Sequence, residues 1–278
     1  MTEKMFDELV DAYDAKSSAA HQNAVREVMQ QIALAGLNRG GFFEHAAFYG
    51  GTSLKIFYGL DRFSEDMDFS LLSPSKTFSL SPFFDALVAE FKIVGREVRI
   101  TEKQKTAVTS MNSAFLKDNT RIFDLQGRQL PNTKIKIEVD TNPPSGFDTE
   151  YKLLMQPYSF MTRCYTLPSS FAGKMSALLF RAWRNRVKGR DWYDFEWYVR
   201  GGVAMDLAHY NMRACQNGNA TAFVTANQFQ ELLRDKIHNA DIERIKEDVM
   251  PFVDDAAKLN IWSREYFLQV ADMMKIKE

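Results

Sequence analysis

Two adjacent glycines, Gly50 and Gly51, constrain the fold of this chain more than any other feature. They follow a short apolar segment at residues 45–49. They precede residues 53–59, which have helical spacing, and residues 66–72, which read as a strand. A strand, a glycine turn, a helix and a second strand in this order are typical of a sheet with helices packed on it. We therefore predict an α/β (α+β) fold with a mixed sheet.

The rest of the chain falls into a mixed first half and a helical second half. In the first half, apolar spacing predicts two helices within residues 4–37 and one at 82–91, whereas residues 97–102, 107–115 and 134–140 read as extended. After a loop with two prolines, helical spacing recurs at residues 171–183, 191–198, 221–234, 241–249 and 259–274. We therefore predict two domains, a core with N-terminal helices at residues 1–145 and a mostly helical domain at residues 146–278.

Charge and composition limit the classes of function. The 278 residues include 35 Lys and Arg and 36 Asp and Glu, so the formal net charge is −1. Binding of nucleic acid through overall positive charge is therefore excluded, and such a site would have to be a local basic patch. The first eight residues mix charges of both signs, no apolar run of 18 residues occurs, and two cysteines cannot form a disulfide framework. We expect no membrane segment and a cytoplasmic location.

Acidic residues alternate on two of the predicted strands. Asp66 and Asp68 share one face of the first strand, because side chains in a strand alternate between faces, and Glu138 and Asp140 share the polar face of a later strand. Carboxylates without nearby His or Cys favour Mg²⁺ or Mn²⁺, which usually act by bridging to phosphate oxygens. The acids are therefore candidate ligands for a metal site that supports nucleotidyl transfer. The alternative is that they only mark the wet face of a sheet.

The glycine turn is a candidate phosphate site. Gly50 and Gly51 let the backbone approach a bound anion, and the N-terminus of the following helix offers free N–H groups. Thr52 or Ser53 adds a hydroxyl group. We expect these residues to contact the phosphates of a nucleotide.

Four short motifs in order resemble those of the AbiEii family of nucleotidyltransferase toxins, which belongs to the DNA polymerase β-like superfamily. They are Gly50-Gly-Thr-Ser-Leu54 with Tyr58-Gly-Leu-Asp-Arg-Phe-Ser-Glu-Asp-Met-Asp-Phe69, then Ile135-Lys-Ile-Glu-Val139, then Lys174-Met-Ser-Ala177, and finally Arg186-Val-Lys-Gly-Arg-Asp-Trp-Tyr-Asp194. The second motif departs from the family pattern, which has Asp followed by a nearby Gly. Whether Glu138 or Asp140 is the third acid is therefore left open.

The resemblance implies an activity, partners and site residues. It implies a toxin that uses a nucleoside triphosphate and Mg²⁺ or Mn²⁺, is paired with an AbiEi-like antitoxin, and adds nucleotides to RNA, as several members do at the 3′ end of tRNA. The helical domain would complete the active-site cleft. The implied catalytic residues are Asp66, Asp68, Lys174 and Asp191; the nucleotide contacts are Gly50, Gly51, Thr52, Ser53, Arg62, Ser64 and Lys174; the metal ligands are Asp66, Asp68, Glu138 and Asp140.

The motif residues outside the acid pairs also have structural explanations. A lysine such as Lys174 suits a phosphate, but on a helix it is usually solvated. Asp191 is placed to cap a helix or to sit in its first turn, where it can still orient a lysine or an arginine. Asp194, one turn later, is placed to hold Arg190. Arg62, with Ser64, reaches the triphosphate or simply fixes the turn before the acid pair.

The densest basic run is a candidate RNA site. It contains Arg181, Arg184, Arg186, Lys188 and Arg190, with Trp183 among them. Phosphates can pair with such cations and a base can stack on the indole ring. The alternative is a solvated helix face whose arginines pair with local acids. Two alternative functions are consistent with part of the sequence evidence. One is nucleotidyl transfer to a small-molecule acceptor, and the other is a regulatory protein that binds nucleotide without catalysing a reaction.

Overall fold

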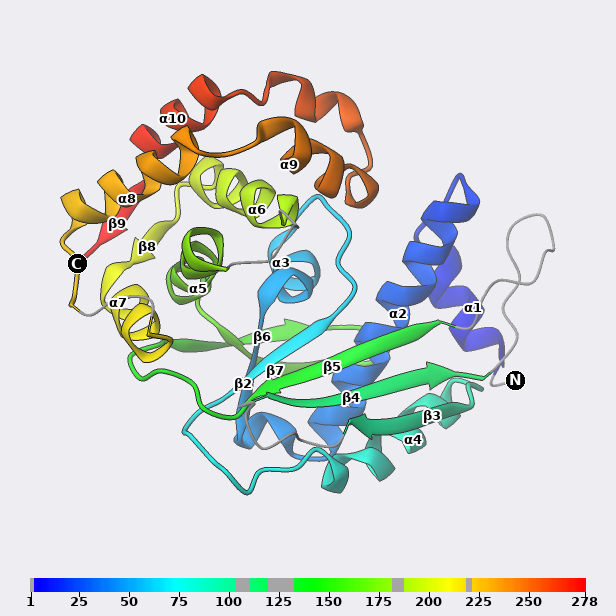
Figure 1. Cartoon of the computed structure of the whole chain (residues 1–278). Coiled ribbons are helices and arrows are strands. Elements are labelled where there is room, and N and C mark those ends of the chain that lie inside the picture. The colour runs from blue at the N-terminus through cyan, green and yellow to red at the C-terminus, as the bar shows by residue number, and fades with distance from the viewer. Residues whose placement is uncertain (1–2, 104–110, 120–132, 182–187, 219–221) are drawn as a thin grey trace. The chain divides into compact units, whose positions relative to one another are not determined.

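The computed structural model describes residues 3–103, 111–119, 133–181, 188–218 and 222–278 (Figure 1). The chain divides into two compact units that alternate along the sequence. Unit 1 comprises Met1–Ser53, Glu65–Pro143 and Tyr151–Cys164, and unit 2 comprises Leu54–Ser64, Pro144–Glu150 and Tyr165–Glu278.

This division differs in two segments from the single boundary at residue 145 that the sequence predicts. Residues 151–164 belong to unit 1 because they contribute strands to its sheet, where Phe48 pairs with Cys164. Residues 54–64 belong to unit 2 because Leu54 and Leu60 are fully buried in its apolar core. The chain therefore passes between the units more than once.

A sheet of seven strands forms the centre of unit 1, in the order β3-β4-β5-β2-β1-β7-β6. The strands are β1 (Ala46–Tyr49), β2 (Met67–Leu71), β3 (Val98–Lys103), β4 (Met111–Asp118), β5 (Lys134–Asp140), β6 (Thr149–Leu154) and β7 (Phe160–Tyr165). The β2–β5 and β1–β7 pairs are parallel, and the β1–β2, β3–β4 and β4–β5 pairs are antiparallel. The predicted α/β fold with a mixed sheet is confirmed.

Helices cover one face of the strands β3, β4 and β5. The helical segments between residues 3 and 93 are α1 (Glu3–Asp11), α2 (Ser18–Arg39), η1 (Phe42–Glu44), α3 (Gly50–Tyr58), η2 (Ser81–Phe83) and α4 (Phe84–Ile93), of which α3 lies mostly in unit 2. The Ser17 side chain caps α2 by accepting a hydrogen bond from the Ala20 N–H group. Helix α2 contacts β5 and α4 contacts β3, and in Figure 1 α2 passes behind β4 and β5. The apolar residues of these strands are buried on the helix side.

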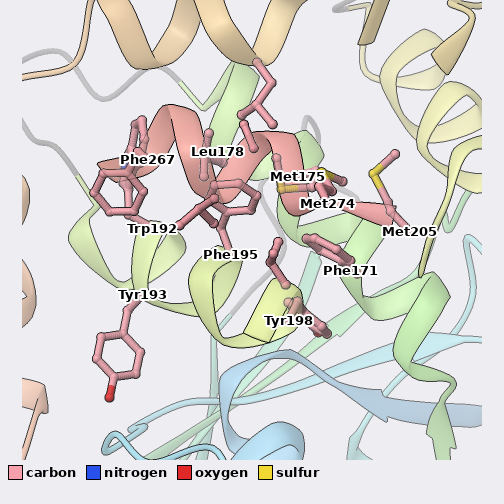
Figure 2. Close-up of a cluster of buried hydrophobic side chains, with 14 of the residues drawn as sticks. Phe171, Met175, Leu178, Trp192, Tyr193, Phe195, Tyr198, Met205, Phe267 and Met274 are labelled. Carbon is pink, nitrogen blue, oxygen red and sulfur yellow. The ribbon is translucent and has the colours of Figure 1, made fainter. Parts of the chain in front are cut away.

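Unit 2 is mostly helical around one apolar core. Its elements are α5 (Leu167–Phe180), α6 (Gly189–Arg200), β8 (Ala204–Asp206), α7 (Leu207–Gln216), α8 (Ala226–His238), α9 (Ile242–Val249), η3 (Met250–Phe252), η4 (Ala256–Ile261), α10 (Arg264–Met273) and β9 (Lys275–Lys277). Figure 2 shows aromatic and methionine side chains gathered in this core. The rings of Phe171 and Tyr198 stack with centroids 4.4 Å apart, which joins α5 to α6.

The structure corrects several local predictions. The strands β6 and β7 and the helix α7 were not predicted, and α5 begins at Leu167 rather than residue 171. Asp191 lies in the first turn of α6, one of the two positions considered for it. The extended segment predicted at 107–115 lies partly outside the described residues, and β4 covers the rest. Among the described residues, no helix has both the length and the apolar character that a bilayer crossing needs.

Candidate functional site

The predicted acids of unit 1 meet on one face of two neighbouring strands. In the parallel β2–β5 pair, Asp68 is aligned with Glu138 and Ser70 is aligned with Asp140. Asp66 directly precedes β2. Asp66, Asp68 and Glu138 are half-buried. Because adjacent strands are about 4.8 Å apart, the backbone places the Asp68 and Glu138 carboxylates side by side.

The two candidates for the third acid occupy different environments. Glu138 stands directly across from Asp68, and one of its oxygens lies 2.7 Å from Lys136 Nζ. Asp140 is buried, and its Oδ1 accepts a hydrogen bond of 3.0 Å from the backbone N–H group of Asn142. Asp140 therefore also has a local structural task where β5 ends. The register favours Glu138 as the partner of Asp68.

Gly50 is fitted to the Asp68 side chain. Its φ of +80° lies in the left-handed region, and a Cβ atom at this position would lie 2.6 Å from Oδ2 of Asp68. Only glycine meets both conditions without strain or displacement. The glycine turn and the acid pair are therefore one structural feature, as the sequence order suggested. Helix α3 begins at Gly50 itself, directly after β1, so the two glycines are its first residues rather than a separate turn before the helix predicted at 53–59 (Figure 1).

The other residues of the turn are more buried than a phosphate site requires. Thr52 and Ser53 are 1% and 3% exposed. The Thr52 hydroxyl donates a hydrogen bond to the backbone carbonyl of Asp66, which ties the first turn of α3 to the start of β2. This contact gives Thr52 a structural role in holding Asp66. Phosphate contacts by Gly51, Thr52 and Ser53 stay a prediction.

The donor set of the acid cluster (Asp66, Asp68 and Glu138) suits magnesium bound together with a nucleotide. In the described part of the chain, no group of three or more His, Cys, Asp or Glu side chains is arranged so that it could hold a metal ion. Mg²⁺ commonly keeps several waters and takes only one or two carboxylates plus substrate phosphates. Asp68 and Glu138 meet that requirement, whereas a metal that needs a complete cage of protein ligands would not fit.

The predicted residues of unit 2 form a buried charge quartet (Arg62, Lys174, Asp191 and Asp194). Arg62 holds Asp194 with two hydrogen bonds, 2.6 Å from Nε to Oδ1 and 2.7 Å from Nη2 to Oδ2. Lys174 Nζ lies 2.7 Å from Asp194 Oδ2 and 2.9 Å from Asp191 Oδ1. The side chains of Arg62 and Asp194 are 2% and 0% exposed. Two cations and two carboxylates therefore compensate each other away from solvent.

The quartet keeps all four groups charged. Burial by itself would raise the pKa of Asp194, but Arg62 and Lys174 hold that pKa below its ordinary value. For Asp191, burial also acts to raise the pKa, and Lys174 and Arg181 bring it below the ordinary range. Burial would lower the pKa of Lys174, but the two aspartates raise it. Each charge is therefore stabilised by its opposite partners.

These contacts bear on the roles predicted for Arg62, Ser64 and Asp194. Arg62 also donates a 2.8 Å hydrogen bond from Nη1 to the carbonyl of Phe63, so its contacts are those of a residue that fixes the turn before the acids. Ser64 in the same turn is buried. The expected Asp194–Arg190 pair is wrong, because Asp194 is taken by Arg62 and Lys174, whereas the Arg190 guanidinium lies over the Phe252 ring at 4.1 Å from its centroid.

The predicted basic run is only partly described. Trp183, Arg184 and Arg186 lie outside the described residues. Arg181 lies 3.8 Å from Asp191, and Lys188 is half-buried with a pKa lowered to about 8, chiefly by burial. Arg181, at the end of α5, therefore contacts the charge quartet, and Lys188, before α6, is partly withdrawn from solvent.

Sequence reasoning missed the partner of Arg62. Arg62 and Asp194 are 132 residues apart, so local spacing gives no sign of the pair. The one available signal was the close recurrence of Asp191 and Asp194 on the predicted helix, which places two carboxylates one turn apart. Two carboxylates in that arrangement indicate that more than one cation is needed nearby.

Comparisons with known proteins agree with the geometry. The model of a family described as "Nucleotidyl transferase AbiEii toxin, Type IV TA system" matches residues 32–270. In fold, the chain is similar to MenT4, a nucleotidyltransferase toxin from Mycobacterium tuberculosis H37Rv, with 13% identity, a TM-score of 0.62 and coverage of 98% of this chain and 89% of that chain. It is also similar to JHP933 from Helicobacter pylori, with 17% identity, a TM-score of 0.51 and coverage of 91% and 90%. No curated protein matches the sequence significantly.

Proposed function

Because the chain belongs to the AbiEii family of nucleotidyltransferase toxins of type IV toxin–antitoxin systems, we propose that it transfers a nucleoside monophosphate from a nucleoside triphosphate to RNA, at the 3′ end of tRNA, with the help of Mg²⁺. The observation that carries this proposal is the alignment of Asp68 with Glu138 on parallel neighbouring strands, beside Gly50. Membership in the family also implies an antitoxin partner, which we propose is AbiEi-like and encoded beside this chain.

In the proposed reaction, a hydroxyl oxygen of the RNA attacks the α-phosphorus of the triphosphate. A new phosphate–oxygen bond forms, the bond to the β-phosphate breaks, pyrophosphate leaves, and the hydroxyl proton is released to solvent. Divalent metal ions, when bound, would stabilise the negative charge of the triphosphate during this transfer. Asp66, Asp68 and Glu138 would hold them, with Lys136 beside Glu138 limiting the local negative charge.

The protein's own contribution is to hold these carboxylates in place before substrate binds. The Gly50 backbone packs against Asp68, Thr52 binds the Asp66 carbonyl, and Gln30 Nε2 donates a 3.0 Å hydrogen bond to the carbonyl of Glu65. Positioned charges that need no rearrangement during the reaction are the largest single contribution to catalysis in many enzymes. The catalytic roles of Lys174 and Asp191 stay predictions.

The proposal is tested by incubating the protein with Mg²⁺, labelled nucleoside triphosphates and total RNA. Wild-type protein should yield labelled RNA and one pyrophosphate for each nucleotide added. Asp68→Asn should abolish the label, because it removes a charge with little change of shape. Asp85→Asn, at an exposed position on α4, is the matched control and should leave the yield unchanged. An equal yield from Asp68→Asn and wild type would refute the assignment.

A further inference from the structure

A row of exposed cations crosses the face of the unit 1 sheet opposite α2 and α4. In the β3–β4–β5 ladder, Arg99 is aligned with Lys117, and Lys117 with Lys134. Side chains of directly paired residues lie on the same face of a sheet, so the three cations form one line across the strands. Their neighbours in sequence, among them Ile100, are on the other face with the helices. We call these three residues the basic row.

The basic row is exposed and leads to the acid cluster. Arg99, Lys117 and Lys134 are all exposed. The next line of the ladder toward the acids contains the half-buried residues Phe115 and Lys136, and the line after that contains Glu138 beside Asp68. With about 3.3 Å per residue along a strand, the basic row lies roughly 13 Å from the Glu138 line.

The described part of the chain provides no acidic partner for the basic row. Among the described residues, no carboxylate lies within ion-pair distance of these three cations. Lys134 Nζ instead lies 3.7 Å from the centroid of the Phe115 ring. Three exposed like charges in adjacent strands repel one another, which lowers the stability of an isolated sheet. On a protein of net charge −1, this local concentration of cations is a surface suited to a polyanion.

We propose that the face of β3, β4 and β5 that carries the basic row binds the RNA strand that enters the acid cluster, with phosphates on the basic row and a base against Phe115. This inference rests on the proposed function, because it treats the polyanion as the acceptor. A stacked strand with about 3.4 Å per nucleotide covers the distance from the basic row to Glu138 with roughly four nucleotides. The combination of cations for phosphates and an aromatic ring for bases is typical of surfaces that bind single strands.

Other polyanions fit this surface less well. An anionic lipid surface would need exposed apolar side chains to enter the membrane boundary, and the apolar residues described on this face of β4, Phe115 and Met111, are both half-buried. An acidic protein segment would gain from the cations but would not need an aromatic ring or an adjoining pair of carboxylates. A nucleic-acid strand uses the cations and the ring, and its 3′ end is what the acid cluster would act on.

The test compares two triple variants that lose the same charge. The first is Arg99→Gln/Lys117→Gln/Lys134→Gln in the basic row. The control is Lys4→Gln/Lys76→Gln/Lys92→Gln, which removes three exposed cations elsewhere in unit 1. Binding of a short labelled single-stranded RNA is measured by fluorescence anisotropy without nucleotide or Mg²⁺, over a range of salt concentrations.

We expect the basic-row variant to bind RNA at least about tenfold more weakly than the control. The slope of the logarithm of the binding constant against the logarithm of salt concentration should become shallower by about 2, because each phosphate contact to a single strand contributes about 0.7 to that slope. Phe115→Leu should weaken binding by about fivefold or more with no change of slope, since stacking on an aromatic ring is worth at least ~1 kcal/mol per base. Equal binding by the two triple variants, or no RNA binding by wild type, would overturn the proposal.

The transfer assay separates this inference from the proposed function. If wild type labels RNA, the basic-row variant should have a higher KM for RNA and an unchanged KM for the nucleotide. Labelling with an unchanged KM for RNA would overturn the inference and leave the proposed function standing. If no protein labels RNA but the basic-row variant alone loses RNA binding, the proposed function fails and the binding surface is supported.

Discussion

We predict that substitutions in the charge quartet of unit 2 lower the free energy of unfolding by several kcal/mol. Arg62→Met removes a 2% exposed cation and leaves Asp194, which is fully buried, with Lys174 as its remaining ion-pair partner in the quartet. Breaking a buried ion pair by removing one partner costs about 3–5 kcal/mol, because the other charge stays out of water. At roughly 2–4 °C per kcal/mol for a chain of this size, the Tm should fall by about 6–20 °C.

The double variant decides whether this cost comes from the unpaired charge. Asp194→Met alone should also cost about 3–5 kcal/mol, because it leaves Arg62 and Lys174 facing Asp191. Arg62→Met/Asp194→Met removes both charges and keeps the Lys174–Asp191 pair, so its loss should be smaller than the sum of the single losses by at least ~2 kcal/mol.

The free energies of unfolding are measured by urea titration for wild type and the three variants. Arg234→Met is the control, since its partner Asp272 and Arg234 itself are 54% and 44% exposed, and such surface pairs contribute about 1 kcal/mol or less. Additive losses in the double variant would show that Arg62 and Asp194 stabilise the fold independently. That result would refute the reasoning from unpaired buried charge.

Three further predictions each concern a single position: Gly50, His209 and the third acid. Gly50→Ala should lower the transfer rate by about 100-fold, because the added Cβ atom would displace Asp68. Gly59→Ala is the control: Gly59 also has a positive φ, +73°, but no atom lies within 4 Å of its Cβ position, so the transfer rate should be unchanged. Equal effects of the two substitutions on the rate would contradict this. His209 is buried with its pKa lowered to about 4, so as the pH falls the unfolded chain binds a proton at this residue before the folded chain does. The free energy of unfolding should therefore fall by ~2 kcal/mol between pH 7.5 and pH 5. Urea titrations of His209→Phe should show a smaller fall, and a fall equal to that of wild type would refute this role of His209. Glu138→Gln should reduce transfer by about 100-fold, whereas Asp140→Asn should have a small effect; the reverse order in the labelling assay would identify Asp140 as the third acid.

The sequence was sufficient for the features that depend on local periodicity. Alternation of polar and apolar residues predicted β2 and β5 and placed their acids on a common face, and helical spacing predicted most of the helices. It did not distinguish Glu138 from Asp140, because that choice depends on the β2–β5 register, which is set by pairing between strands more than 60 residues apart.

The missed elements have weaker local patterns. On β6, the exposed positions Tyr151 and Leu153 are apolar, so alternation gave no indication of which face is buried. The Arg62–Asp194 pair depends on packing over 132 residues of separation. The basic row likewise becomes visible only when three strands are aligned, since each strand contributes a single member to it.

The most direct test of the central claim is the location of a bound divalent ion. Crystals grown with Mn²⁺ and a non-hydrolysable nucleoside triphosphate analogue allow the ion to be placed by anomalous scattering. We predict an ion coordinated directly by Asp68 and Glu138, with phosphate oxygens completing its shell. An ion held elsewhere, or a nucleotide bound with Asp68 and Glu138 both free of metal, would contradict the proposed role of these two strands.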